Sequence, residues 1–251
     1  QIDRASHSQD LIQGGAGQVI EQTFSLSEAG YLDLLLVIDN SDSMTDYREQ
    51  VGANLTPMLS SISNTNWRVA IINTDHKCVR NVFTRDAFVG AEQAESQRFY
   101  TAVTTGDQLS PVERGIEMAV RGFSTQAECG DADGFAQNNW FRPDSNKVVM
   151  IVSDEDNCGS SPEDKAMCGD VSEPGVIYPH FETSDFVAAL PEAKVYGILH
   201  DPAQCYNGYE GGADEYVDLV DATGGQWRPF CAPELGMTYE ELEKAMNDKN
   251  D

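Results

Sequence analysis

Two uninterrupted apolar runs constrain the fold of this chain more than any other feature. One spans Leu32–Ile38, and the other spans residues 148–152 within the segment KVVMIVS. Apolar runs that do not alternate with polar residues are typical of strands covered on both faces, as in a parallel sheet. Both are far shorter than the ~20 apolar residues that cross a bilayer. The sequence therefore predicts a buried sheet and no membrane-spanning segment.

The rest of the chain alternates between strand and helix patterns. Apolar residues recur every three or four positions from Met44 to Ile62, which predicts a helix that Pro57 should kink or shorten. Further strands are expected at 67–73, 81–84, 147–153 and 193–200, with an edge strand at 19–26, and further helices at 112–123, 184–190 and 215–223. Ser184 is the expected N-cap of one helix, and Gly224 with Gly225 should close another. This alternation predicts an α/β, Rossmann-like fold: a mainly parallel central sheet flanked by helices on both faces.

Length and composition indicate a single domain. With 251 residues and 40% hydrophobic content, an α/β domain can bury roughly 75% of its unfolded surface. We expect residues 1–17 to be a flexible N-terminal segment and 18–251 to form one domain. The polar stretch 155–181 should be a surface excursion, and 239–251 a surface helix that frays. Gln1 is preceded by neither an initiator Met nor a signal sequence, so we interpret the chain as a mature or trimmed form.

The charge of the chain excludes two classes of partner. Its 42 acidic and 16 basic residues give a formal net charge of -26. A surface this negative repels nucleic-acid phosphates and anionic membranes alike. The same charge is also common in soluble proteins from saline habitats, so it can report the environment instead of a partner.

The cysteines point to an oxidising compartment. There are six, and none forms a CxxC pair, so three disulfides are favoured over a zinc site. Six cysteines allow about 15 pairings. The shortest loops join Cys158 to Cys168 and Cys205 to Cys231, which leaves Cys78 with Cys129. We therefore expect disulfide-stapled loops, each bridge adding ~2–4 kcal/mol to the stability of the fold.

Oxygen-bearing side chains follow both apolar runs directly. Asp39, Ser41 and Ser43 leave the first run, and Asp154 leaves the second. Ligands of parallel sheets bind beyond the carboxyl ends of the strands, so these side chains should meet at one edge. Two carboxylates about 5 Å apart repel by about 3 kcal/mol at an effective dielectric near 20, which favours a bound cation. An all-oxygen set with few charges suits Mg²⁺ better than a dedicated Ca²⁺ cage.

The segment DLLLVIDNSDSM (residues 33–44) resembles the first strand and metal loop of a von Willebrand factor A (VWA) domain. The metal-ion-dependent adhesion site (MIDAS) of that family is a DxSxS loop, here Asp39, Ser41 and Ser43, completed by a distant hydroxyl and a distant Asp. Ser110 matches the hydroxyl position because Gly115 and Ile116 follow it at the family's spacing, whereas Thr104 and Thr105 do not match. Asp154 in IVSDED matches the distant Asp.

This resemblance extends over residues 32–225, with two departures. Ser110 stands where the family has Thr, which keeps a hydroxyl. Glu155 replaces the Gly that follows the family's Asp, so either Glu155 or Asp156 can join or crowd the site. The segments FRPDSNKVVMIVSDEDNC and YVDLVDATGG also resemble a group of secreted bacterial VWA proteins.

The resemblance implies a binding module. Mg²⁺, or alternatively Mn²⁺ or Ca²⁺, would sit on the five MIDAS positions, with a coordination position open to a carboxylate of the partner. That partner would be a protein or glycan of another cell, a host or a matrix. The implied setting is a secreted or cell-surface protein, such as a bacterial or pilus-associated adhesin, within which the chain could belong to a larger assembly.

Three other readings stay open at this point. Ser41 or Ser43 could merely cap the helix that follows. The same metal site could dock a sister protein in a non-adhesive envelope scaffold. A hydrolase that uses the metal to activate water is a third candidate, but the sequence has no GxSxG, P-loop, GxGxxG or HExxH motif, so we expect no enzyme activity.

Overall fold

The computed structural model of the chain describes residues 30–62, 65–76, 78–105, 113–124, 140–158, 180–205 and 212–230. The expected flexible segment 1–17, the edge strand 19–26, the frayed helix 239–251 and most of the excursion 155–181 lie outside these ranges. Within them, no helix is both long and apolar enough to cross a bilayer.

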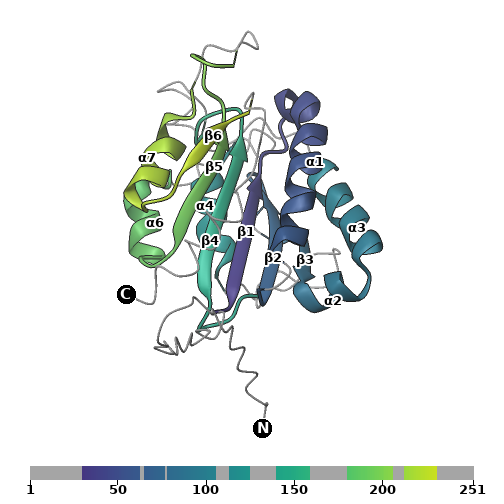
Figure 1. Ribbon diagram of the computed structural model, residues 1–251. Coiled ribbons are helices and arrows are strands. Elements are labelled where there is room, and N and C mark those ends of the chain that lie inside the picture. The colour runs from purple at the N-terminus through teal and green to yellow at the C-terminus, as the bar shows by residue number, and fades with distance from the viewer. Residues whose placement is uncertain are drawn as a thin grey trace, which may run out of the picture.

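The central sheet has six strands in the order β3-β2-β1-β4-β5-β6 (Figure 1). Their bounds are β1 Leu32–Ile38, β2 Trp67–Asn73, β3 Asn81–Thr84, β4 Asn146–Ser153, β5 Lys194–Leu199 and β6 Trp227–Pro229. Every neighbouring pair is parallel except β2 and β3, which are antiparallel. The predicted α/β, Rossmann-like sheet is therefore confirmed, whereas β6 was not predicted.

The register of the sheet aligns the ends of its central strands. Ile38 at the end of β1 pairs with Asn73 of β2 on one side and Val152 of β4 on the other. The backbone N–H of Asp39 then donates to the carbonyl of Val152, with N and O 2.9 Å apart. The loops that follow β1 and β4 consequently leave the sheet side by side.

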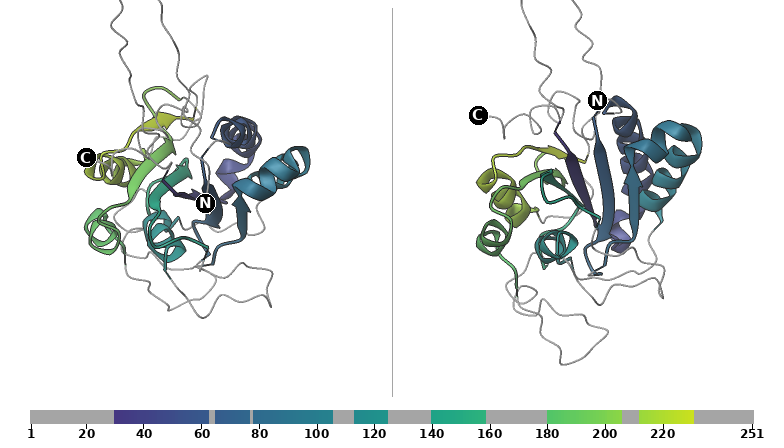
Figure 2. Two further views of the ribbon diagram at one scale, coloured as in Figure 1. Left: turned by 60° about the horizontal axis from the view of Figure 1, so that its bottom comes forward. Right: turned by 90° about the horizontal axis from the view of Figure 1, so that it is seen from below.

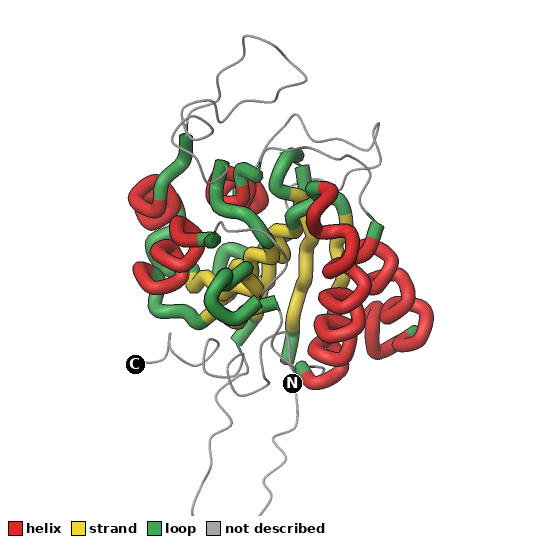
Figure 3. Tube along the Cα trace, turned by 90° about the horizontal axis from the view of Figure 1, so that it is seen from above, coloured by secondary structure: helices red, strands yellow, loops and turns green. Residues whose placement is uncertain are grey.

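Helices cover both faces of the sheet (Figures 2 and 3). Their bounds are η1 Asp42–Met44, α1 Thr45–Ser61, α2 Arg85–Gly90, α3 Glu92–Thr104, α4 Gly115–Gly122, α6 Thr183–Ala189 and α7 Asp214–Ala222. Alternate residues of β1 enter different cores: Leu34 packs in the cluster with α1, α2 and α3, whereas Leu35 packs in the cluster with α4, α6 and α7. Burial on both faces explains why the β1 run is apolar without alternation.

Several helix boundaries differ from the predictions. Helix α1 continues through Pro57 to Ser61, so the helix is not shortened, whereas the alternative, a kink, stays a prediction. Leu55 and Leu59 on either side of Pro57 are fully buried, and their packing outweighs the lost backbone hydrogen bond. Helices α2 and α3 were not predicted, and α4 begins at Gly115, three residues later than expected from 112.

The two predicted caps had different outcomes. Glu182, and not Ser184, is the N-cap of α6, because Glu182 and Asp185 form a reciprocal capping box there. The glycine closure of α7 is confirmed: Gly224 has a φ of 70°, and the N–H of Gly225 donates to the carbonyl of Val220.

No cysteine within the described ranges is a free thiol. Cys78, Cys158 and Cys205 are each disulfide-bonded. Cys129, Cys168 and Cys231 lie outside these ranges. The pairing of the six cysteines and the stapling of the loops therefore stay predictions.

Candidate metal-binding site

The loops that follow β1 and β4 bring Asp39 and Asp154 to one edge of the sheet. Both residues come directly after the last residue of their strand. Asp39 is 0% exposed and Asp154 is 2% exposed. Both carboxyl groups are thus withdrawn from water at the position where parallel sheets bind their ligands.

Asp39 is held by hydrogen bonds to both oxygens of its carboxylate. Oδ1 accepts from the backbone N–H of Ser41 at 2.7 Å, which tightens the loop after β1. Oδ2 accepts from the hydroxyl of Ser153 at 2.7 Å, which ties this loop to the end of β4. These bonds orient the carboxylate rigidly before any ligand arrives.

The serine hydroxyls bridge the two loops. Ser41 Oγ and Ser43 Oγ are 2.8 Å apart, and Ser43 Oγ donates to Oδ1 of Asp154 at 3.1 Å. Neither η1 nor α1 receives a side-chain hydrogen bond at its N-cap. Ser41 holds the N-cap position of η1 without a capping side-chain bond, and Met44 is the N-cap of α1. The reading of Ser41 or Ser43 as a cap of the helix from Thr45 is therefore wrong.

Exposure increases from the sheet outward. Ser41 is 5% exposed, whereas Ser43 is an exposed residue. The guanidinium of Arg48 lies on the buried side, where its Nη2 donates to the carbonyl of Ser41 at 2.7 Å. The cluster is accordingly shielded from solvent on the side of Arg48 and open to solvent at Ser43.

Burial makes the negative charges of the two carboxylates unfavourable. It raises the pKa of Asp39, although the hydrogen bonds from Ser41 and Ser153 and the charge of Arg48 act in the opposite direction. Burial, followed by the charge of Asp39, raises the pKa of Asp154 to about 7. A cation between them would compensate both costs.

Glu113 is a third buried carboxyl near this edge, and the sequence analysis missed it. Burial and then the charges of Asp39 and Glu155 raise its pKa to about 10. The pKa of the Tyr216 hydroxyl is also raised, by burial first and then by Asp39 and Glu113. No motif marks Glu113 in the sequence, because its neighbours come from distant segments.

The fifth predicted ligand, Ser110, lies outside the described residues. The two residues used to align it are described: Gly115 opens α4, and Ile116 is fully buried. The N–H of Gly115 donates to Tyr216 Oη at 3.0 Å. A Cβ at Gly115 would lie 2.5 Å from that oxygen, which explains the need for a residue without a side chain.

Asp156 does not join the cluster, because it caps a helix. Its Oδ1 accepts from the backbone N–H of Asn157 and, at 2.9 Å, from that of Glu215 in the first turn of α7. Glu155 is partly exposed, and its charge acts on both Asp154 and Glu113. Of the two residues left open by the sequence, Glu155 is the one whose charge acts on Asp154.

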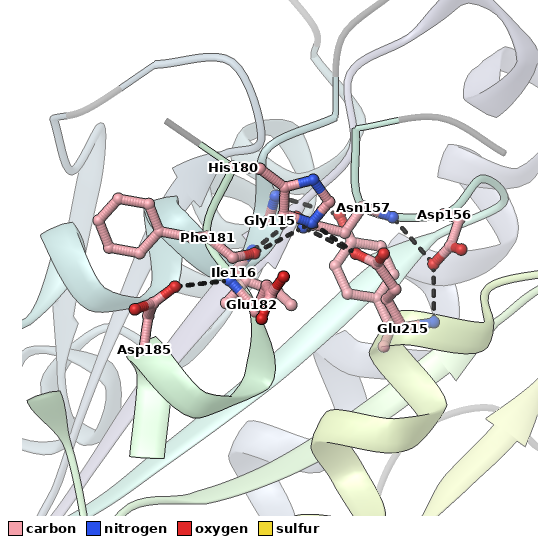
Figure 4. Close-up of polar contacts among 10 residues, drawn as sticks. Gly115, Ile116, Asp156, Asn157, His180, Phe181, Glu182, Asp185 and Glu215 are labelled. Carbon is pink, nitrogen blue, oxygen red and sulfur yellow. Dashed lines mark hydrogen bonds and ion pairs between the residues drawn. The ribbon is translucent and has the colours of Figure 1, made fainter. Parts of the chain in front are cut away.

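Asn157 anchors the loop that carries Asp154 (Figure 4). Its Oδ1 accepts from the N–H of Ile116 at 3.3 Å, and its Nδ2 donates to the carbonyl of Phe181 at 2.9 Å and to Glu215 Oε2 at 3.1 Å. His180 Nε2 lies 3.1 Å from the same Glu215 oxygen. One amide thus connects the loop after β4 to α4, α7 and the segment before α6.

The donor chemistry suits a hard divalent cation. The cluster consists of two carboxylates, Asp39 and Asp154, and two hydroxyls, Ser41 and Ser43, all of them oxygen donors. No group of three or more His, Cys, Asp and Glu side chains in the described ranges has metal-binding geometry. A cation held here would therefore depend on the serine hydroxyls as well as the carboxylates.

Comparisons with known proteins found matches among solved structures alone: no protein-family model and no curated protein matches the sequence. The pilus adhesin SpaC from Lactobacillus rhamnosus GG, in its open conformation, is 11% identical with a TM-score of 0.46; the match covers 88% of this chain and 29% of that one. The conserved hypothetical protein BatB from Bacteroides thetaiotaomicron is 11% identical with a TM-score of 0.43, covering 87% of this chain and 98% of that one.

A third similar structure is proximal thread matrix protein 1 from the mussel byssus, with a zinc-occupied MIDAS motif. It is 10% identical with a TM-score of 0.40, and the match covers 87% of this chain and 46% of that one. The chain thus spans less than half the length of both the adhesin and the byssus protein. None of the three is similar enough to assign a function to this chain.

Proposed function

We propose that this chain is a VWA-type, divalent-metal-dependent binding module. Asp39, Ser41, Ser43 and Asp154 hold the cation, and Ser110 completes the set. The observation that carries the proposal is the Ser43–Asp154 hydrogen bond of 3.1 Å, because it joins the two loops that the DxSxS pattern and the distant Asp assign to one ion. We propose that the module binds its partner without catalysing a reaction.

Mg²⁺ is the proposed resident ion, with Mn²⁺ and Ca²⁺ as substitutes. Two carboxylates balance the charge of one divalent ion, and the neutral hydroxyls leave it electrophilic. Small hard cations are held in proteins by few carboxylates and complete their shell with waters or with oxygens of the ligand. The exposed position of Ser43 supports a solvent-facing vacancy at the ion.

The proposed ligand of that vacancy is a Glu or Asp carboxylate of a protein, or an acidic group of a glycan, on another cell, a host or a matrix. The net charge of -26 disfavours a strongly acidic partner surface except at the ion itself. We propose that the module lies outside the cell, in a surface or pilus-associated adhesin. The resemblance to secreted bacterial VWA proteins supports this location, as do the disulfide-bonded Cys78, Cys158 and Cys205.

Calorimetric titration of Mg²⁺ into the wild type and Asp39→Asn tests the metal site. We expect a saturable heat for the wild type and none for the variant, whose amide keeps the size of the side chain. Glu49→Gln is the matched control, since it removes an exposed carboxylate of α1 outside the cluster. Equal heats for the wild type and Asp39→Asn would contradict the proposal.

The open coordination position has its own test. Acetate added to the Mn²⁺-loaded protein should lower the water-proton relaxivity, because a bound carboxylate displaces water from the ion. An unchanged relaxivity at saturating acetate would show that no position is open to a carboxylate. Consumption of a hydrolysable substrate by the loaded protein would instead support the hydrolase reading.

A further inference from the structure

Glu113 is fixed at the same sheet edge by its backbone. Its carbonyl accepts from the N–H of Cys158 in the loop after β4. The N–H of the next residue, Arg114, donates to the carbonyl of Thr74, just beyond β2, at 3.0 Å. Glu113 therefore stands between the ends of two strands, next to the candidate metal site.

The carboxyl group of Glu113 is buried, and the side chain that interacts with it is another acid, Glu155. The residue is 0% exposed, and among the described residues neither Oε1 nor Oε2 has a hydrogen-bond partner. Arg114, which follows it, directs its guanidinium to Glu117 at 3.4 Å and to the carbonyl of Asp75 at 3.1 Å. A buried carboxylate without a donor or a counter-charge is costly, so this carboxyl group either keeps its proton or binds a positively charged ligand.

Other acids surround this carboxyl. Glu155 lies within interaction range of Glu113 on one side and of Asp154 on the other, and Asp39 acts on Glu113 as well. Glu155 is partly exposed, so it is the more accessible of the two carboxyl groups. Two facing carboxylates are both acceptors when ionised, and only a shared cation or a shared proton can join them.

We propose that Glu113 and Glu155 form a second site for a hard divalent cation, beside the one built on Asp39 and Asp154. Carboxylate pairs that leave the rest of the shell to water are a common way of holding such ions. The ion enters at Glu155 and displaces the proton that the buried Glu113 otherwise holds. The two sites share no side-chain ligand, so the second site does not require the proposed function to be correct.

The number of bound ions tests this proposal. The probe is Mn²⁺ alone, equilibrated by dialysis with the whole chain in about 1 M KCl, where a Debye length of about 3 Å suppresses binding to the acidic surface. We expect two Mn²⁺ per chain for the wild type, and one each for Glu113→Gln, Glu155→Gln and Asp39→Asn. Glu49→Gln, on the exposed surface of α1, should keep two.

The stability of Glu113→Gln is a second readout, separate from metal binding. Because the variant removes a buried, uncompensated acid, its metal-free form should unfold at a higher temperature than the wild type. A variant that failed to fold would show the reverse shift. Loss of one ion together with a raised melting temperature therefore supports the second site.

Other ion counts separate the two proposals. One ion in the wild type that Glu113→Gln retains overturns the second site, and the Glu113–Glu155 pair then holds a proton. One ion that is lost in Glu113→Gln but retained in Asp39→Asn supports the second site and overturns the first. One ion lost in both variants overturns the second site and makes Glu113 a ligand of the first. No ion in the wild type overturns both.

Discussion

Ser43 Oγ donates a hydrogen bond to Asp154 Oδ1 at 3.1 Å, across 111 positions of the sequence. Ser43 lies in η1, the short helix that follows β1, and Asp154 directly follows β4, the strand paired with β1. The bond therefore shows that the segments after β1 and β4 converge. It also places an exposed hydroxyl beside a buried carboxylate, the combination on which the proposed metal site depends.

Removing this hydroxyl should weaken metal binding without unfolding the protein. Ser43→Ala deletes one neutral ligand, and we expect the affinity for Mg²⁺ to fall about 10- to 100-fold, as for other supporting contacts of metal sites. Calorimetry measures the affinity, and circular dichroism the fold. Ser60→Ala, an exposed hydroxyl on α1 that donates to Glu92, is the control and should bind as the wild type does. Unchanged affinity in Ser43→Ala would exclude that hydroxyl as a ligand.

The stability of the metal-free protein should fall as the pH rises from acid to mildly alkaline values. The pKa of Asp154 rises from 3.8 to about 7, and that of Glu113 from 4.5 to about 10, so the folded chain retains protons that the unfolded chain has released. The stabilisation is complete below the unfolded values and is lost as the pH passes the folded ones. Each group contributes a slope of about -1.4 kcal/mol per pH unit between its two pKa values.

Urea unfolding in the presence of a chelator, repeated at a series of pH values, measures this slope. Asp154→Asn should flatten the curve below about pH 7, since its amide binds no proton in either state. Saturating Mg²⁺ should raise stability most at high pH, because the cation then replaces the missing protons. A metal-free protein that became more stable between about pH 5 and pH 8 would contradict the assignment of these carboxyls as uncompensated.

Truncating Asn157 should destabilise the fold. Asn157→Ala leaves the N–H of Ile116 and the carbonyl of Phe181 without their partner, at a cost of about 2–4 kcal/mol. Chemical denaturation measures the loss. Asn54→Ala removes an amide that donates an exposed hydrogen bond to Gln50 of the same helix, and it should change the free energy of unfolding by less than about 0.5 kcal/mol. Equal effects in the two variants would mean that Asn157 does not hold the loop.

Two glycines with equally open surroundings should respond differently to alanine. A Cβ at Gly224 or at Gly90 would meet no atom within 4 Å, but only Gly224 has a positive φ, 70°. Gly224→Ala should therefore cost about 1 kcal/mol, whereas Gly90→Ala, at the end of α2, should be neutral or stabilising by up to about 1 kcal/mol. Thermal unfolding of both variants checks this, and a neutral Gly224→Ala would mean that the C-cap of α7 tolerates a side chain.

Local sequence patterns predicted most of the fold. The β1 run is apolar on both faces because it lies between two layers of helices, so its burial is visible in its composition alone. The short strand β6 pairs only over Gly197–Leu199 of β5, and its sequence WRP carries no strand signal. Helix α3 was missed because few of its residues are buried: Phe99 and Val103 are the buried members of a largely polar segment.

The sequence by itself determined which residues leave the ends of the strands, because strand and helix periodicity and the order of the DxSxS loop are local properties. Asp39, Ser41, Ser43 and Asp154 could be named from that order. Only the tertiary structure decided that Glu113 lies unpartnered beside Glu155, that Asp156 caps α7 and that Ser153 orients Asp39. These relationships depend on burial and on contacts between segments distant in the chain, and no local pattern of residues encodes the distance between two loops.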